Sequence, residues 1–239
     1  MTTNSHTLAG RVALVTGSGR GIGKAIAEAL AREGAHVVLT GRTASQVDQA
    51  AQAIRGNGGQ AKAVPADITD ERDVARLVDE TLKIKGTVDV LVNNAGIGVF
   101  KPVVEMDVAE FDAMWKVNMR GVFLVTRAVL PGMIKARHGA IINIASLAGK
   151  NMFKGGAGYG ATKWALRGFA GSLMLEVREH NIRVVTVFPG SVDTGFSPGG
   201  KRGAQITQPE DVASAVMFAI NTPERSMFSE IDLRPTNPS

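Results

Sequence analysis

The sequence predicts an α/β fold with a doubly wound, three-layer arrangement, in which helices cover both faces of a parallel β-sheet. Two observations predict it. Short apolar runs alternate with amphipathic helical segments along the 239 residues, and most of the runs are unbroken stretches of valine, isoleucine and leucine. Unbroken runs are typical of strands buried on both faces, and a β-α-β-α order favours parallel strands with right-handed crossovers. Because no linker, repeat or low-complexity segment divides the chain, we expect residues 1–239 to form one domain.

Seven apolar runs are expected to form the strands, and the last of them is weaker than the others. A helix is expected directly after the first strand, because Ile22, Ile26 and Leu30 recur on one helical face and Gly34 ends the pattern. The expected strands are Val12–Thr16, His36–Thr40, Ala61–Pro65, Val88–Val92, Ala140–Ile144, Val184–Phe188 and Phe228–Leu233.

The composition excludes several classes of function. The chain has no cysteine, which rules out disulfides, cysteine-ligated metals and thiol nucleophiles. The four histidines lie far apart in the sequence without metal-ligand spacing, so we expect no metal site. The net charge is +5, but the basic residues are scattered among acidic ones, and only one tyrosine and two tryptophans could stack on bases. We therefore expect no nucleic-acid partner.

Nothing in the sequence indicates export or insertion into a membrane. The segment Met1–Gly10 lacks the basic and apolar regions of a signal peptide. No unbroken apolar run approaches the roughly 18 residues of a membrane span. We therefore expect a cytoplasmic protein without a membrane partner.

A glycine-rich loop follows the first expected strand and leads into the first helix. Glycines at such a turn let the backbone approach a pyrophosphate group, which the N–H groups at the helix start then hold. Position 22 is isoleucine, so the G-x-G-x-x-G spacing is not met, and Ser18 and Ala25 do not fit a Walker A loop. The loop still predicts a dinucleotide site formed by Gly17, Ser18, Gly19, Arg20, Gly21, Ile22 and Gly23.

The end of the second expected strand indicates which dinucleotide binds. An acidic residue at this place binds the ribose 2′-hydroxyl of NAD, whereas an arginine accommodates the 2′-phosphate of NADP. The strand ends Leu-Thr-Gly-Arg at residues 39–42, without a carboxylate. Arg42 could hold a phosphate with paired N–H donors, so we expect NADP(H) to be preferred over NAD(H).

Four polar residues predict the chemistry of carbonyl reduction. A free tyrosine has a pKa of about 10, and a cation one helical turn away would lower that pKa and suit the phenol to proton transfer near neutrality. Tyr159 and Lys163 have this spacing. Ser146 lies thirteen residues before Tyr159, just after the fifth strand, and Asn118 lies midway along the helix that follows the fourth.

Together these motifs resemble the short-chain dehydrogenase/reductase family over nearly the whole chain. The shared features are Thr-Gly-x-x-x-Gly-x-Gly from Thr16, Asn-Asn-Ala-Gly at residues 93–96, and Tyr159-x-x-x-Lys163. The resemblance implies a Rossmann-type, seven-stranded parallel sheet. It also implies that Tyr159 is the acid/base and that Lys163 lowers its pKa and binds the nicotinamide ribose. Ser146 would position the carbonyl, and Asn118 would hold a water that links Lys163 to solvent.

The resemblance also assigns the cofactor and substrate contacts. Arg20 is similar to the family's second NADP-favouring basic residue. Asp67 and Ile68 would contact the adenine, while the substrate would lie beneath a lid at residues 195–207 and beside Met152 and Phe153. Further cofactor contacts are expected at Asn94, Ala95, Gly96, Pro189, Gly190, Val192 and Thr194.

The substrate and the assembly are left with alternatives. The sequence is similar to the 3-oxoacyl-[acyl-carrier-protein] reductase branch, with two departures. The chain lacks the Gly-Gly pair that is common near the C-terminal end in that branch. Arg137 fits a carrier-binding basic residue, but His180 stands where a second one is expected. A small ketone is as plausible as an acyl thioester. A non-catalytic NADP(H)-binding scaffold would have lost catalytic residues, and an epimerase or dehydratase would carry a longer C-terminal region. Small residues on the Tyr159 helix would let a second helix approach closely, namely Ala161, Ala165, Gly168, Gly171 and Ser172. In the family this surface commonly forms a dimer within a tetramer, so the resemblance implies a homodimer or homotetramer.

Overall fold

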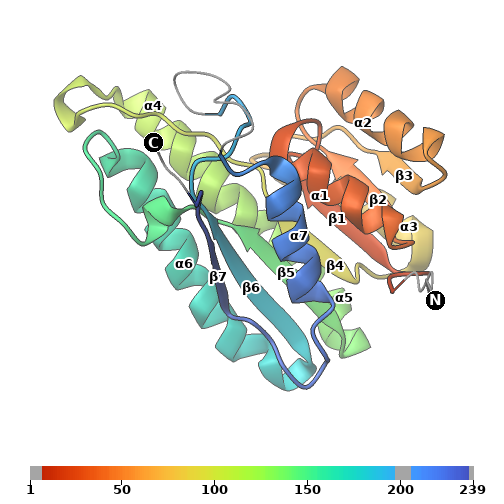
Figure 1. The fold of residues 1–239 in the computed structure, drawn as a ribbon. Coiled ribbons are helices and arrows are strands. Elements are labelled where there is room, and N and C mark those ends of the chain that lie inside the picture. The colour runs from red at the N-terminus through yellow and green to blue at the C-terminus, as the bar shows by residue number, and fades with distance from the viewer. Residues whose placement is uncertain (1–6, 197–205, 237–239) are drawn as a thin grey trace.

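Seven parallel strands form one sheet through the centre of the protein, and helices cover both of its faces (Figure 1). The computed structural model describes residues 7–196 and 206–236. The strand order is β3-β2-β1-β4-β5-β6-β7, and every neighbouring pair is parallel. The predicted fold class is confirmed. The strands are β1 Val12–Thr16, β2 His36–Thr40, β3 Gln60–Ala63, β4 Val90–Asn93, β5 Gly139–Ile144, β6 Ile182–Pro189 and β7 Glu230–Leu233.

The helices bury the apolar side chains that alternate along the strands. In β1, Ala13 and Val15 belong to one core together with α1, α2 and α7, whereas Leu14 belongs to a second core with α3, α5 and α6. Adjacent residues of a strand point to opposite faces, so an unbroken apolar strand supplies both cores. The helices are α1 Gly21–Arg32, α2 Ala44–Gly56, α3 Glu71–Lys85, α4 Val108–Trp115, α5 Val122–Ala136, α6 Ala157–Val177 and α7 Pro209–Ile220, with short turns η1 Val103–Glu105, η2 Lys116–Gly121, η3 Leu147–Gly149 and η4 Arg178–His180.

The order of the strands places a crevice at the edge of the sheet. The chain runs outward from β1 through β2 to β3 and then crosses back to β4, which pairs with β1 on its other side. Connections therefore leave the carboxyl ends of β1 and β4 in opposite directions. Ligands of open α/β sheets bind at this switch point, and the glycine loop follows β1 there.

The segment between α4 and α5 differs from expectation in two ways. Residues Lys116–Gly121 form a π-helical turn inside what is otherwise one long helix. That helix, Val108–Ala136, is long and apolar enough to span a membrane by length and mean hydropathy, although no unbroken apolar run had suggested one. Helices in the core of soluble proteins can have this length and composition as well. Of an apolar 18-residue stretch of Val108–Ala136, 44% is buried inside the fold.

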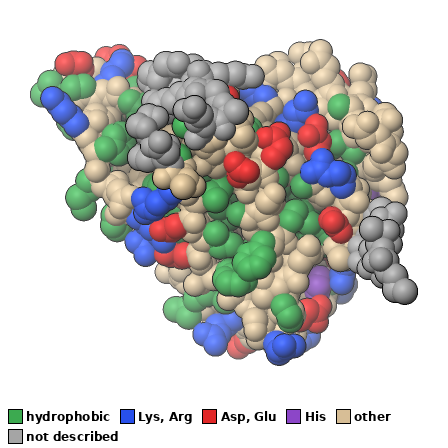
Figure 2. All heavy atoms as spheres, in the orientation of Figure 1, with side chains coloured by type: hydrophobic (Ala, Val, Ile, Leu, Met, Phe, Trp, Pro, Cys, Tyr) green, Lys and Arg blue, Asp and Glu red, His purple; other side chains and the backbone are tan. Residues whose placement is uncertain are grey.

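Two apolar areas of the surface have no partner within the described chain. Hydrophobic side chains gather over α7 and β7 (Figure 2), where the rings of Phe218 and Phe228 lie 4.9 Å apart with both residues exposed. On α6, the predicted stripe of small residues faces solvent, with Ala165 partly covered. A Cβ added at Gly168 or Gly171 would meet no atom within 4 Å.

Candidate active site

A cavity of about 1020 Å³ lies along the carboxyl ends of the strands. The residue directly after the end of β1, β2, β4 and β5 lines it in each case, as does the last residue of β6. These residues are Gly17, Gly41, Asn94, Ala145 and Pro189. The cavity therefore occupies the position that the strand order favours for a ligand.

Asn94 holds the glycine loop against the end of β4. Its Nδ2 donates hydrogen bonds to the carbonyl oxygens of Thr16 and Gly17 at 2.9 and 3.0 Å. A Cβ at Gly23 would lie 2.4 Å from Asn94 Nδ2 and 2.4 Å from the Gly17 oxygen, and one at Gly17 would lie 2.8 Å from the Ala95 Cα. Glycine is required at both positions because no side chain fits.

The start of α1 is free to receive an anion. The first turn contains no acidic residue, and the residue before it, Arg20, makes no side-chain cap hydrogen bond. The N–H groups of a helix start and its dipole favour a phosphate at such a place. Gly19, Arg20, Gly21 and Ile22 all line the cavity here. These features fit the pyrophosphate of a dinucleotide.

Two residues of the predicted glycine loop, Ser18 and Gly23, face the interior of the protein and do not line the cavity. Gly23 is packed against Asn94, as described above. Ser18 is fully buried: its hydroxyl donates to the Val15 oxygen at 2.8 Å and accepts from the Thr40 N–H at 2.9 Å. The Ser18 side chain thus joins the loop to β2, and its cofactor contact remains a prediction.

At the end of the cavity that contains Arg20, the strand β2 ends without a carboxylate side chain. Gly41 and Arg42 line this end of the cavity, and Arg20 lies on the same side. Asp67 and Ile68 line it after β3, where the Asp67 carboxylate accepts a hydrogen bond from the Thr69 N–H at 2.9 Å. Gln46 also lines this end, in contact with the glycine loop, and no motif in the sequence indicated it.

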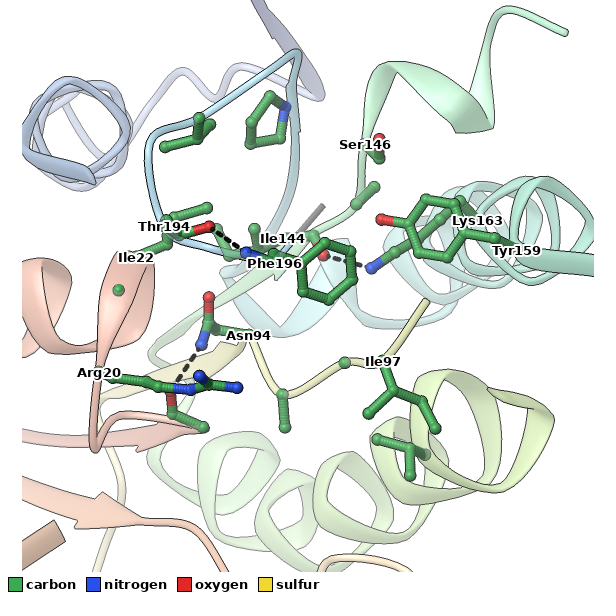
Figure 3. Close-up of a pocket in the computed structure, with 18 of the residues that line it drawn as sticks. Arg20, Ile22, Asn94, Ile97, Ile144, Ser146, Tyr159, Lys163, Thr194 and Phe196 are labelled. Carbon is green, nitrogen blue, oxygen red and sulfur yellow. Dashed lines mark hydrogen bonds between the residues drawn. The ribbon is translucent and has the colours of Figure 1, made fainter. Parts of the chain in front are cut away.

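Tyr159, Lys163 and Ser146 gather at the other end of the cavity, away from Arg20 (Figure 3). Tyr159 and Lys163 are only 6% and 4% exposed. Lys163 Nζ donates to the Ile144 oxygen at 3.0 Å and lies 5.8 Å from the centre of the Tyr159 ring. The Ser146 hydroxyl accepts from the Ala148 N–H at 3.1 Å and also hydrogen-bonds the Tyr159 hydroxyl.

Burial dominates the electrostatics of this group. It raises the pKa of Tyr159 to about 12, against a smaller opposing effect of the hydrogen bond with Ser146. It also lowers the pKa of Lys163 to about 8. The expected lowering of the Tyr159 pKa by Lys163 is wrong for the protein alone, because the loss of water around the phenol outweighs other effects. The phenol is thus protonated at neutral pH, as a proton donor must be.

Asn118 lies behind the cavity, on the π-helical turn η2, and joins two elements of the site. Its Nδ2 donates to the Ile97 oxygen at 2.9 Å and to the Thr162 hydroxyl at 3.0 Å, while its Oδ1 accepts from the Ile97 N–H at 2.9 Å. It therefore holds the loop after β4 against α6. A Cβ at Gly96 would lie 3.3 Å from Asn118 Oδ1 and 3.7 Å from Lys163 Nζ, so glycine leaves a gap between the two.

Phenylalanine rings surround Tyr159. Phe100, Phe153 and Phe196 line the cavity, and sequence analysis identified only Phe153. The prediction for Met152 is wrong: its side chain is 88% exposed and does not line the cavity, since adjacent residues of an irregular loop point in different directions. Leu147, Arg234 and Pro235 also line the cavity without having been predicted, as do Ser191 of the loop after β6 and Ile206 of the predicted lid.

The loop after β6 closes one side of the cavity. Its lining residues include Pro189, Gly190, Val192 and Thr194, and the Thr194 hydroxyl accepts a hydrogen bond from the Phe196 N–H at 3.3 Å. Most of the predicted lid at residues 195–207 lies outside the described residues, which include only 195–196 and 206–207 of it.

Two further predictions concern metals and carrier-protein binding. Within residues 7–196 and 206–236, no group of three histidine, aspartate or glutamate side chains could hold a metal ion. Arg137 donates to the backbone carbonyl oxygen of Glu179 at 2.8 Å, and His180 Nε2 lies 3.6 Å from the Glu179 carboxylate. The two candidate carrier contacts are thus neighbours, and a carboxylate lies beside His180.

Known proteins share both the sequence and the fold. The model of the short chain dehydrogenase family matches residues 11–202. An uncharacterized oxidoreductase of Staphylococcus saprophyticus is 37% identical over 227 residues, which are 94% of this chain and 97% of that protein. A metagenomic short-chain oxidoreductase solved in complex with NADP is 40% identical, with a TM-score of 0.86 over 97% of this chain and 99% of the other. A 3-ketoacyl-(acyl-carrier-protein) reductase from Brucella melitensis, complexed with NADH, is 33% identical, with a TM-score of 0.86 over 94% and 97% of the two chains.

Proposed function

Because the chain belongs to the short-chain dehydrogenase/reductase family and is an oxidoreductase, we propose that it reduces a ketone with NADPH, with Tyr159 as the proton donor. One observation carries the proposal: the glycine loop and the group of Ser146, Tyr159 and Lys163 line opposite ends of the same cavity. A cofactor seated on the loop can therefore extend to the buried phenol.

Each residue of the site has a separate role in the proposed reduction. NADPH, when bound, supplies the hydride. Ser146 and Tyr159 donate hydrogen bonds to the carbonyl oxygen, and Tyr159 gives up its proton as negative charge develops on that oxygen. Lys163, whose pKa of about 8 leaves it mainly protonated at pH 7, stabilises the phenolate that remains. Asn118 keeps the loop after β4 in place beside Lys163.

Two arginines support a preference for NADPH. Arg20 and Arg42 line the end of the cavity that lacks a carboxylate after β2. A guanidinium group binds a phosphate with paired, charge-assisted hydrogen bonds. Of the two similar structures described above, one holds NADP and the other NADH, so the comparison supports a nicotinamide cofactor. The arginines favour the phosphorylated form.

Substitution of Tyr159 by phenylalanine tests the proposal. The variant keeps the ring and its aromatic contacts but loses the hydroxyl, so NADPH binding measured by fluorescence should remain within about twofold. Turnover of a panel of ketones should fall at least ~10²-fold, the scale of positioned acid catalysis. Unchanged turnover would contradict the assigned role, and so would a loss of NADPH binding that accounts for the whole effect.

A second candidate function is reduction of a 3-oxoacyl thioester on a carrier protein. The likeness to the reductase from Brucella melitensis favours it. Glu179 argues against it, because its carboxylate lies 3.6 Å from His180 Nε2 and weakens this surface for an acidic partner. Turnover of an acyl-carrier-protein substrate at least tenfold better than that of the free thioester would establish the second function.

We also propose that the protein forms a homodimer or homotetramer, as enzymes of this family commonly do. The exposed stripe of small residues on α6 allows close approach of a second helix. The exposed aromatic pair Phe218 and Phe228 offers another contact over α7 and β7 (Figure 2). Light scattering of the purified protein measures the mass directly, and a monomer at micromolar concentration would contradict this.

A further inference from the structure

Three phenylalanines form an aromatic enclosure around the catalytic phenol. We call Phe100, Phe153 and Phe196 the aromatic enclosure. The centre of the Tyr159 ring lies 5.2 Å from that of Phe100 and 5.9 Å from that of Phe196. Phe100 in turn lies 6.0 Å from Phe153 and 6.3 Å from Phe196. These separations are those of interacting aromatic pairs, which prefer tilted or edge-to-face arrangements.

The enclosure is assembled from segments far apart in the chain. Phe100 follows β4, Phe153 precedes α6 and Phe196 follows β6. Phe153 and Phe196 remain 45% and 40% exposed, although both line a cavity. Their rings thus present apolar surface to the space in which a substrate must lie, and covering that surface stabilises a complex.

The rest of this end of the cavity is also largely apolar. Leu147 and Ala148 follow Ser146, and Pro235 packs beside Leu147 across Gly190. Arg234 also reaches the cavity next to Pro235, and its guanidinium lies 3.6 Å from the Asp232 carboxylate, which Lys150 contacts at 2.5 Å.

We propose that the substrate is an uncharged ketone with an aromatic ring attached next to its carbonyl carbon. The inference rests on the proposed function and names its substrate class. With the carbonyl oxygen held by Ser146 and Tyr159, an adjacent ring lies within reach of the aromatic enclosure. A flat ring contacts phenylalanine edges and faces at low entropic cost, whereas a carboxylate placed against these rings loses its hydration to an apolar surface.

Three matched α-keto compounds test the substrate class. Methyl benzoylformate and methyl pyruvate differ only in phenyl against methyl, and benzoylformate carries the phenyl ring with a free carboxylate. We expect kcat/KM with NADPH to be at least about 10-fold higher for methyl benzoylformate than for methyl pyruvate, the effect of burying one phenyl group. It should also be higher than for benzoylformate, whose carboxylate would have to give up its hydration. Conjugation makes the phenyl ketone less electrophilic than the methyl ketone, so intrinsic reactivity cannot produce the preference over methyl pyruvate.

Variants of the enclosure locate the origin of the preference. Phe100→Leu and Phe153→Leu keep apolar bulk but remove a ring, and each should lower the ratio of methyl benzoylformate to methyl pyruvate by about 2- to 10-fold. Met152→Leu is the matched control, because Met152 adjoins Phe153 yet lies outside the cavity. Its ratio should stay within twofold of the unmodified protein.

The outcomes separate the two proposals. If methyl pyruvate is reduced and methyl benzoylformate is not preferred, or if benzoylformate is the best of the three, the substrate inference is wrong while the proposed function stands. The substrate inference is also wrong, with the proposed function intact, if the phenylalanine variants retain the full preference. If no compound of this set or of a broad ketone panel is reduced with NADPH or NADH, the proposed function itself is wrong.

Discussion

The Lys163→Met variant removes a buried ammonium group while keeping a side chain of similar length. Lys163 is 4% exposed, and the described residues give its Nζ one hydrogen bond, to the Ile144 oxygen, rather than a carboxylate partner. Burying a cation without an opposite charge destabilises a fold. The variant should therefore be more stable than the unmodified protein when no cofactor is bound, although it should lose most of its activity.

The magnitude follows from the pKa of Lys163. Burial lowers this pKa from 10.5 to about 8, and each pKa unit is worth about 1.4 kcal/mol. The charged form thus costs roughly 3 kcal/mol of folding free energy at pH 7. Methionine gives up the hydrogen bond to the Ile144 oxygen, which is worth about 1 kcal/mol. We expect a net gain in the free energy of unfolding of about 2 kcal/mol.

The sign of the pH dependence is fixed by the same pKa. Between pH 8 and 10.5 the unfolded chain keeps the Lys163 proton while the folded protein loses it. Stability rises with pH wherever the unfolded state binds more protons. The unmodified protein should therefore gain stability from this group across that window, and the variant should not. Tyr159, whose pKa is raised to about 12, adds an opposite slope only above pH 10 in both proteins.

Urea unfolding followed by tryptophan fluorescence, at pH 7 and pH 9.5, measures the stability gain and its pH dependence. All samples are compared at one protein concentration, since assembly also changes stability. Lys116→Met on the π-helical turn is the control, because Lys116 is exposed and its loss should change stability by less than about 0.5 kcal/mol. A Lys163→Met variant that is less stable than the unmodified protein at pH 7 would refute the reasoning.

Two other substitutions test the cofactor end of the cavity. Arg42→Asp should raise KM for NADPH relative to that for NADH by about 10-fold or more, since a charge-assisted contact is lost and a repulsion is added; an unchanged ratio from steady-state kinetics would contradict the NADPH assignment. Gly23→Ala places a Cβ 2.4 Å from Asn94 Nδ2, so dinucleotide binding measured by calorimetry should weaken at least tenfold. Gly56→Ala is its control, because a Cβ there meets no atom within 4 Å, and binding of the Gly23 variant at the level of this control would refute the packing argument.

Local apolar patterns predicted much of the sheet. The bounds of β1 and β2 agree with the unbroken runs Val12–Thr16 and His36–Thr40, because every residue of those runs pairs with a neighbouring strand. β6 extends beyond its apolar run on both sides, to Ile182 and Pro189, since its ends are set by pairing with β5 and β7. Hydrogen-bonded partners far along the chain fix such ends, and a single run cannot show them.

The site could be predicted where chemistry dictates spacing along the chain. Tyr159 and Lys163 share a helix face, so their spacing alone brought them together. Phe100 and Phe196 follow different strands, and the fold alone brings them to Tyr159. The direction of the Tyr159 pKa shift depends on burial, which spacing does not reveal. The inward turn of the Ser18 side chain depends on its hydrogen bonds to the backbone of β1 and β2.

Titration of the phenol tests the central claim most directly, because Tyr159 is the only tyrosine in the chain. Its absorbance can be followed once the contribution of the two tryptophans is subtracted. In the cofactor-free protein we predict that the phenol ionises with a pKa of about 12. Saturating NADP⁺ should lower this pKa by about one unit or more, the effect of a nearby positive charge. A pKa near the free value in the folded protein, unchanged by NADP⁺, would contradict the role of Tyr159 as the buried proton donor.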